Sequence, residues 1–356
     1  MAPRAAFLSF RFGPTDGVSV VARSWRAAFD RFGYDTVAVA GEGEADRHVA
    51  GFGLQAPVDG EEPDVAGLER ALADVDLVVV ENLLTIPLNL PASAAAAKVL
   101  AGRPALLHHH DPPWHRARFA HITELPAHDP AWRHVAITHL LAGELAERGI
   151  DATLIYNAFT PPPARTAAEH AALRAEVRAA LGVAPGEWLV AHPVRAIERK
   201  EVPAAIALCE ALGATYWLLG PAEEGYGPEL ERVLGAARCR VLHRTWDDVE
   251  GIYAAADHVT FPSTWEGFGN PPIEAALHRR TVSVGPYPVA AELRAKGFQW
   301  WSPDQVDTIR AAIEHPDSPE VRRLLDRNES VAREHFSPER MQGLLWHLLD
   351  GAGWLP

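Results

Sequence analysis

A glycine-containing loop between an apolar run and a helix start has the residue types best suited to chemistry. The segment PSTWEGFGNPPIEA covers residues 262–275, and its paired prolines suit the first turn of a helix. Backbone N–H groups at a helix start bind phosphate oxygens, and the helix dipole favours the negative charge. Gly267 and Gly269 allow a ligand to approach the backbone closely. A glycine turn before a helix also occurs without a ligand, so this loop alone only suggests a phosphate site.

Two carboxylates accompany this loop. Glu266 lies in the loop before the predicted helix, and Glu274 lies one turn inside it. Carboxylate oxygens accept hydrogen bonds from hydroxyl groups. One carboxylate can therefore face a sugar while the other reaches a ribose.

Basic residues follow the first strand of the same half of the chain. Arg195 and Lys200 stand in the segment VRAIERK, residues 194–200. Ligands bind beyond the carboxyl ends of strands in open α/β sheets, and an arginine fork with a lysine point charge suits a diphosphate. An isolated basic pair is more often a solvated loop. Both features fall at the carboxyl edge of one predicted sheet, which favours anion binding at both.

These segments belong to the second of two alternating α/β series. Continuous apolar strands separated by helices predict a parallel sheet covered on both faces. The first series has predicted strands at 5–10, 36–40, 76–80, 105–109, 134–138 and 153–156, with helices at 19–32, 65–73, 92–101 and 140–148. The second has strands at 188–192, 215–219, 240–242, 258–261 and 281–284, with helices at 202–212, 228–236, 247–255 and 271–278.

The length of the chain favours two domains. At 356 residues it exceeds the size at which one hydrophobic core stops growing. We expect an N-terminal Rossmann-like domain over 1–160, a linker over 161–186 and a C-terminal Rossmann-like domain over 187–336. A closing amphipathic helix, about 337–356, is expected to pack back on the first domain.

Charge and cysteine content narrow the classes of partner. The net charge of −14 repels nucleic acid and anionic lipid, so we expect neither nucleic acid nor strong membrane association. The two cysteines form no CxxC pair, which argues against a disulfide framework or a thiolate zinc site. The N-terminal apolar run is too short for a signal peptide. These features together favour the cytoplasm.

The two motifs of the second series resemble the donor site of retaining glycosyltransferases of the GT-B fold, family 4. Glu266 and Glu274, with Gly-Phe-Gly between them, resemble the hallmark of that family, and Arg195 with Lys200 resembles its Arg-x4-Lys element. The segments VLHRTWDDVEGIYAAADHVTFPS (241–263) and LIYNAF (154–159) are also similar. The resemblance spans nearly the whole chain and is most specific over 188–285. It implies two facing Rossmann-like domains with parallel sheets and an interdomain cleft.

The resemblance also implies roles for the matched residues. The co-substrate would be a nucleoside-diphosphate sugar, with no metal and no other cofactor. Arg195 and Lys200 would neutralise the diphosphate, while Glu266 would bind sugar hydroxyls and Glu274 ribose hydroxyls. The distal phosphate and the sugar would be held by backbone amides of Gly267, Phe268, Gly269 and Asn270.

The first series offers a histidine run and a second glycine turn. His108, His109 and His110 precede an aspartate, which invites a metal site, yet adjacent strand residues point to opposite faces and cannot easily share one ion. In the resembled family the fourth strand of the first domain often ends in a histidine that contacts the donor sugar. The His-Asp pair makes His110 the choice, with His109 as the alternative. The turn Gly13–Gly17 matches the family's glycine loop only in part, and Gly17 is its better candidate for contacting donor or acceptor.

The predicted activity is therefore transfer of a hexose of glucose or mannose type to a hydroxyl on a small molecule or glycan, with retention of configuration. The alternatives are a nucleotide-sugar epimerase of the same fold and a non-catalytic sugar- or nucleotide-binding protein. A dinucleotide oxidoreductase is disfavoured because no GxGxxG follows the first strand. The Asp74-Val75-Asp76 triplet precedes a strand, so we interpret it as a turn and expect no divalent metal there.

Overall fold

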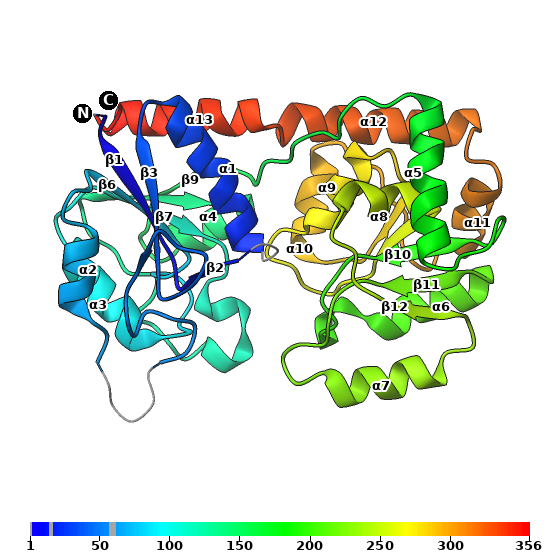
Figure 1. Ribbon diagram of the computed structural model, residues 1–356, viewed down its shortest axis with the longest axis horizontal. Helices are drawn as coiled ribbons and strands as arrows, with labels where there is room; N and C mark the ends of the chain where they lie inside the picture. Colours follow the sequence, from blue (N-terminus) through cyan, green and yellow to red (C-terminus); the bar gives the residue numbers. More distant parts are fainter. Residues whose placement is uncertain (1, 14–16, 57–61) are drawn as a thin grey trace. The chain divides into compact units, whose positions relative to one another are not determined.

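The computed structural model describes residues 2–13, 17–56 and 62–356 (Figure 1). The chain divides into two compact α/β units, which are described separately below. The first unit contains residues 1–158 and 338–356, and the second contains residues 159–337. The expected parallel α/β architecture is confirmed, since all the paired strands of both main sheets run parallel.

The first unit is built on a seven-stranded sheet with the order β5-β3-β1-β6-β7-β8-β9. Its strands are β1 (Arg4–Leu8), β3 (Asp35–Ala40), β5 (Arg47–His48), β6 (Leu77–Glu81), β7 (Ala105–His109), β8 (Trp132–Ala136) and β9 (Ala152–Leu154). The short pair β2 (Arg11–Phe12) and β4 (Glu42–Gly43) lies apart from it. The helices are α1 (Gly17–Arg31), α2 (Val65–Ala71), α3 (Leu90–Leu100), α4 (His139–Ala146) and α13 (Pro338–Gly351), with 3₁₀ turns η2 (Pro113–His115) and η3 (Ala117–Phe119).

Alternation along the strands divides the core of this unit into two clusters. Ala6 and Leu8 of β1 belong to the cluster that contains buried residues of α2 and α3. Ala5 and Phe7 belong to the opposite cluster, with residues of α1 and α13. Helix α13 lies beside α1 (Figure 1) and buries Met341, Leu345 and Leu349 in that second cluster. The sheet is therefore covered on both faces, as parallel sheets require.

The second unit is built on a five-stranded sheet with the order β12-β11-β10-β13-β14. Its strands are β10 (Leu189–His192), β11 (Thr215–Leu218), β12 (Val241–His243), β13 (His258–Phe261) and β14 (Val282–Val284). Its helices are α5 (Ala167–Ala180), α6 (Val202–Leu212), α7 (Gly227–Ala236), α8 (Val249–Ala255), α9 (Asn270–Leu277), α10 (Pro288–Ala295), α11 (Val306–Glu314) and α12 (Pro319–His335), with the 3₁₀ turn η4 (Glu198–Lys200).

Helix α5 falls within the range 161–186 that the sequence suggested as a linker. Thr166 and Glu169 form a capping box that starts this helix. Along its length, the guanidinium groups of Arg174 and Arg178 both bind the carboxylate of Asp257, and α5 packs against α8. Helix α5 is thus part of the second compact unit.

Over the residues that the structure describes, we find no helix that combines the length and the apolar character needed to span a membrane.

Candidate functional site

Both sheets have a topological switch point, where the order of strands reverses. In the first unit β1 lies between β3 and β6, and in the second unit β10 lies between β11 and β13. Connections diverge at such a point and leave a crevice beyond the carboxyl ends of the two strands, where open α/β sheets bind ligands. The segments after β6 and β7, and those after β10 and β13, contain the polar side chains described below.

Direct hydrogen bonds hold the segments after β10 and β13 together. The backbone N–H of Thr264 donates to the carbonyl of Arg199 at 3.0 Å. In return the guanidinium of Arg199 donates to the carbonyl of Trp265 at 3.0 Å and to Glu266 Oε2 at 3.2 Å. The two sequence motifs, separated by more than sixty residues, therefore form one cluster at the switch point of the second sheet.

Lys200 and Glu266 form a buried ion pair within this cluster. Lys200 Nζ lies 2.5 Å from Glu266 Oε1, and the two residues are 9% and 6% exposed. Burial lowers the pKa of Lys200, and the carboxylate of Glu266 opposes that shift. An ammonium that is removed from water needs an anion beside it. Glu266 fills this role, and a diphosphate is likewise an anion.

Arg195 occupies a more open position on the same segment. Its side chain is 55% exposed and its guanidinium lies 2.6 Å from Glu223. The backbone beside it is fixed, because the N–H of Ala196 donates to the carbonyl of Pro221 at 2.8 Å. Gly220 permits this approach, since a Cβ there would lie 2.3 Å from the carbonyl oxygen of Val194. Arg195 is thus an exposed cation on a loop whose backbone is hydrogen-bonded.

The glycine loop after β13 is shaped by Gly269, the residue before α9. Gly269 has φ +98°, and a Cβ there would lie 2.3 Å from the hydroxyl of Tyr287. Only glycine adopts this conformation without strain. Phe268, which is buried, stacks on Phe159 with ring centroids 6.1 Å apart. The loop is therefore held on both sides of the turn, and α9 starts immediately after it with Asn270.

Glu274 lies on the second turn of α9 and meets α8. Tyr253 Oη donates to Glu274 Oε2 at 2.6 Å, and the Tyr253 ring stacks on His278 at 4.7 Å. Burial raises the pKa of Glu274, and the hydrogen bond from Tyr253 opposes that rise. The carboxylate thus keeps one hydrogen bond that orients it within the second unit.

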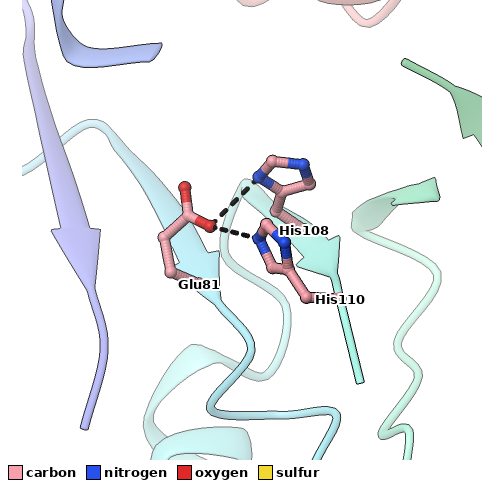
Figure 2. A group of neighbouring side chains, drawn as sticks. All are labelled: Glu81, His108 and His110. Carbon is pink, nitrogen blue, oxygen red and sulfur yellow. Dashed lines mark hydrogen bonds and ion pairs between the residues drawn. The ribbon is translucent and has the colours of Figure 1, made fainter. Parts of the chain in front are cut away.

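The polar cluster of the first unit combines one carboxylate with two imidazoles. Figure 2 shows the Glu81 carboxylate directed at both His108 and His110. His110 Nε2 lies 3.0 Å from Glu81 Oε2 in a hydrogen bond. His108 Nδ1 lies 3.0 Å from the same oxygen, but outside the direction of a hydrogen bond. Glu81 and His108 are fully buried, and His110 is 6% exposed.

His109 points to the opposite face of the sheet, as strand alternation predicts. Its Nδ1 lies 2.7 Å from Thr85 Oγ1 and its Nε2 lies 2.9 Å from His134 Nδ1. This series of hydrogen-bonded imidazoles continues from His134 Nε2 to His128 Nδ1 at 3.0 Å. Both ring nitrogens of His109 are therefore used inside the unit, whereas His110 lies at the edge where ligands bind in such sheets.

The turn Gly13–Gly17 is described only at its ends, because residues 14–16 lie outside the described residues. The N–H of Gly13 donates to Ser19 Oγ at 2.9 Å, and the guanidinium of Arg23 donates to the carbonyl of Gly13 at 2.9 Å. Gly17 is the exposed first residue of α1, and a Cβ there would meet no atom within 4 Å. The structure therefore gives no steric reason for glycine at position 17.

The Asp74-Val75-Asp76 triplet precedes β6 and takes part in ion pairs. Asp74 accepts from Arg47 at 2.6 Å and also binds Arg4. These hydrogen bonds, above all those from Arg47, lower the pKa of the Asp74 carboxyl. The arginines thus give Asp74 a structural role at the amino edge of the sheet.

The structure brings most of the sequence-predicted donor residues into one cluster of the second unit, and adds residues that the sequence argument missed. Arg199, Lys200 and Glu266 are in direct contact, and Glu274 lies on the helix that follows the same loop. The missed residues are Glu81, Arg199, Tyr253 and Tyr287. Glu81 had a visible signal, a charged residue that ends the apolar run LVVVE of β6.

Comparison with known proteins gives a consistent result. Residues 199–315 match the family model described as glycosyl transferases group 1. Mannosylglucosylglycerate synthase from Thermotoga maritima is 24% identical, over 96% of this chain and 98% of its own. This range of residues contains Lys200, Glu266 and Glu274, so the family match includes the described cluster.

Solved structures extend the likeness to the whole chain. HepE from Anabaena, in complex with UDP-glucose, matches with a TM-score of 0.74 and 20% identity, covering 98% of this chain and 99% of that one. Sucrose-phosphate synthase from Thermosynechococcus elongatus matches with a TM-score of 0.69 and 16% identity, covering 98% of this chain and 100% of that one. The expected GT-B fold is confirmed. Residues 199–315 thus match the glycosyl transferases group 1 family, and the chain is a glycosyltransferase that uses a nucleotide sugar.

Proposed function

We propose that this enzyme transfers a hexose of glucose or mannose type from a nucleoside-diphosphate sugar to a hydroxyl acceptor, with retention of configuration and without a metal ion. The observation that carries the proposal is the buried contact of Lys200 with Glu266 at the switch point of the second sheet. A lysine held there by a carboxylate is a cation kept ready for an anionic ligand.

The donor diphosphate is bound by cations of this cluster. Lys200 and Arg199 share Glu266, and Arg195 adds a third cation from the exposed part of the same loop. When the glycosidic bond of the donor breaks, negative charge grows on the leaving diphosphate. Fixed cations and the backbone N–H groups of Gly267–Asn270 stabilise that charge more in the transition state than in the ground state. These cations supply the charge that a divalent ion supplies in other enzymes.

The sugar and the ribose are bound by an imidazole and by carboxylates. Glu266 accepts hydrogen bonds from sugar hydroxyls, Glu274 accepts from the ribose, and His110 contacts the transferred sugar. His110 is preferred over His109 because both ring nitrogens of His109 are already used within the first unit. The catalytic set that we propose is His110, Arg195, Lys200 and Glu266.

The identity of the hexose is supported by what similar proteins make or bind. One relative is a mannosylglucosylglycerate synthase, and HepE was solved with UDP-glucose and with UDP and glucose. A uridine nucleotide with glucose is therefore the first donor to test, and a mannose donor is the second. The acceptor that we propose is a small hydroxylated molecule or a glycan.

Retention follows from attack on the face from which the leaving group departs. The acceptor oxygen bonds to the anomeric carbon as the bond from that carbon to the diphosphate oxygen breaks. The acceptor proton passes to the departing phosphate oxygen, so the products are the glycoside and the protonated nucleoside diphosphate. No side chain then has to act as the nucleophile, which leaves Lys200 and Arg195 the electrostatic role described above.

The first test is thermal unfolding with UDP, GDP and ADP added separately, each in EDTA. A nucleotide at about 100 times its dissociation constant stabilises the folded state by about 2.7 kcal/mol, which raises Tm by a few degrees. A shift with one nucleotide in EDTA supports a metal-independent donor site and names its base. If magnesium is required for the shift, the metal-independent part of the proposal is wrong.

The second test separates transfer from isomerisation. The enzyme is incubated with the donor identified in the first test and with a set of hydroxylated acceptors, and the products are resolved by mass and by anomeric NMR signals. A glycoside whose anomeric configuration matches the donor supports a retaining transferase. A changed nucleotide sugar that forms without an acceptor would identify an epimerase instead.

A further inference from the structure

We propose that Glu81 is a positioning residue that holds the His110 imidazole with its proton on Nε2 and presents Nδ1 to the transferred sugar. The proposal rests on the role given to His110 above and goes beyond it. It concerns a carboxylate that has no assigned part in the reaction and that lies within the first unit.

Strand register brings Glu81 and His110 together. Glu81 is the last residue of β6 and pairs with His108 of β7 in the parallel register. Residues two apart on a strand share a face, so His110 follows His108 on the α1 side of the sheet. Glu81 Oε2 then lies 3.0 Å from His110 Nε2 (Figure 2). This places the carboxylate next to β1, at the switch point of the first sheet.

The backbone around His110 is fixed separately by Asn82. Its Oδ1 accepts from the backbone N–H groups of His110 at 3.2 Å and of Asp111 at 3.1 Å. Asn82 itself has φ +62°, an uncommon conformation for a residue other than glycine, and its N–H donates to the carbonyl of His108 at 3.1 Å. Asn82 thus sets the position of the His110 backbone, and Glu81 sets the ring.

The protonation state of Glu81 determines which nitrogen of His110 carries hydrogen. Burial alone would raise the pKa of this carboxyl, but His108 and His110 hold it at about 2, so Glu81 is ionised at neutral pH. An ionised carboxylate only accepts hydrogen bonds. The nitrogen that faces it, Nε2 of His110, must therefore donate, and in the neutral ring Nδ1 is an acceptor. A sugar hydroxyl can donate to that atom.

His108 does not compete for this role. It is fully buried and its ring stacks on Trp25 with centroids 3.9 Å apart. Burial lowers the pKa of His108 to about 4, so its ring is neutral at pH 7. Its Nδ1 lies 3.0 Å from Glu81 Oε2 without the direction of a hydrogen bond, and its Nε2 has no hydrogen-bond partner among the residues that the structure describes. His108 therefore fills the wall of the cluster, and His110 is the hydrogen-bonded partner of Glu81.

The same three side chains have the composition of a zinc site, since their ligand atoms lie within 4.8 Å of one another. Distances favour the hydrogen bond. Zinc holds nitrogen and oxygen ligands at about 2.0–2.2 Å, which in a tetrahedron separates two ligand atoms by about 3.4 Å. Here both imidazoles lie 3.0 Å from one carboxylate oxygen. That distance is normal for a hydrogen bond.

The test uses the full-length enzyme and the near-isosteric variant Glu81→Gln. A glutamine presents either an acceptor or a donor to Nε2, so the ring is no longer held in one form. Nitrogen-15 NMR should show only the Nε2–H form for His110 in the natural enzyme and a mixture in the variant. We expect kcat to fall about 10-fold to 100-fold, while the affinity for UDP alone changes less than about 2-fold.

A double-mutant cycle with His110→Gln shows whether Glu81 acts through His110. In the His110→Gln background, Glu81→Gln should lower kcat by less than about 2-fold. An equal loss in both backgrounds, or an Nδ1–H signal for His110 in the natural enzyme, would overturn the proposal. His110→Gln with natural activity would instead refute the proposed function of His110 and leave the NMR result standing.

Two further outcomes are covered by the same samples. If Glu81→Gln does not fold, the NMR spectrum of the natural enzyme still decides which nitrogen of His110 carries the proton. If the purified enzyme holds one equivalent of zinc that EDTA removes together with activity, Glu81 is a metal ligand and the positioning proposal is wrong. Activity and histidine signals that are unchanged by EDTA support it.

Discussion

The two units place their polar side chains at the same position in the fold and use different groups there. Each has its cluster beyond the carboxyl ends of parallel strands, next to the strand where the order reverses. In the second unit the cluster pairs the ammonium of Lys200 and the guanidinium of Arg199 with Glu266. In the first unit Glu81 is paired with the imidazoles of His108 and His110 instead.

The difference in side chains corresponds to the charge of the ligand that we propose for each cluster. A diphosphate needs full positive charges, so Lys200 keeps its ammonium in a buried site by retaining an anion beside it. A sugar carries no charge, so oriented neutral groups suffice, and the imidazole of His110 gives its N–H to Glu81 and offers an acceptor to the sugar. The same position on two sheets thus serves different chemistry through the side chains it carries.

The largest expected effect is a loss of folding stability at low pH, which buried histidines cause in both units. Burial lowers the pKa of His108 and His134 in the first unit to about 4, and of His192 and His258 in the second to about 3. The folded pKa values lie below the unfolded value of about 6.5, so the unfolded chain binds more protons between pH 6.5 and 4. Stability is therefore fully present above about pH 6.5 and is lost as the pH falls.

Each of these histidines can remove up to about 1.4 kcal/mol per pH unit, so four can remove up to about 5.6 kcal/mol per pH unit. We expect Tm to decrease steeply from pH 6.5 to pH 5, measured by calorimetry in buffers of constant ionic strength. Glu274, whose pKa is raised in the folded state, acts in the opposite direction and reduces the total loss of stability. A flat Tm over this window would show that the buried histidines bind protons in the folded state.

The next largest effect should come from removing a positive charge from the polar cluster of the second unit. Lys200→Met keeps the apolar stem and removes the ammonium that faces Glu266. We expect kcat/KM for the donor to fall about 100-fold to 1,000-fold, since a charge that stabilises the leaving group is lost. Lys98→Met, at an exposed position of α3, is the matched control. Equal kinetics of the two variants would remove Lys200 from the donor site.

Much of the fold follows from the sequence because apolar strands and amphipathic helices alternate regularly. The predicted strand 258–261 and helix 202–212 agree with β13 and α6 at both ends. In contrast, α12 was not predicted. Its many charged residues reflect a largely exposed surface, and only packing beside α9 shows which of its residues are buried. Local periodicity in the sequence predicts helices with a wide apolar stripe and misses helices whose buried side is narrow.

For the site, sequence spacing predicted residues on one segment and could not predict contacts between segments. The loop after β13 was found because Glu266, Gly269 and Glu274 lie close together in the chain. Glu81 and His110 come from different strands, and only the register of β6 with β7 brings them together. The same is true of Tyr253, which reaches Glu274 from the preceding helix. Tertiary packing therefore supplied the partners that orient the predicted residues.

A smaller effect should test the rigidity of the polar cluster in the second unit. Gly269→Ala introduces a Cβ that would lie 2.3 Å from Tyr287 Oη, at a residue with φ +98°. We expect unfolding free energy to decrease by about 1–3 kcal/mol and donor KM to rise. Because Tyr287→Phe removes the hydroxyl, it should recover part of the loss in the double variant. If recovery is absent in urea unfolding, backbone strain alone accounts for the cost.

The smallest effect concerns the hydrogen bond that orients Glu274. Tyr253→Phe removes the hydroxyl that donates to Glu274 Oε2 at 2.6 Å and keeps the ring that stacks on His278. We expect a loss of about 1–1.5 kcal/mol in unfolding free energy, because a hydrogen bond to a carboxylate is lost. Donor KM should change about 2-fold to 5-fold, whereas Glu274→Gln should weaken UDP binding about 10-fold. Tyr226→Phe, next to α7, is the control. If Tyr253→Phe weakens UDP binding as much as Glu274→Gln, the hydroxyl itself contacts the nucleotide. The donor site of the second unit then includes α8 as well as the loops after β10 and β13.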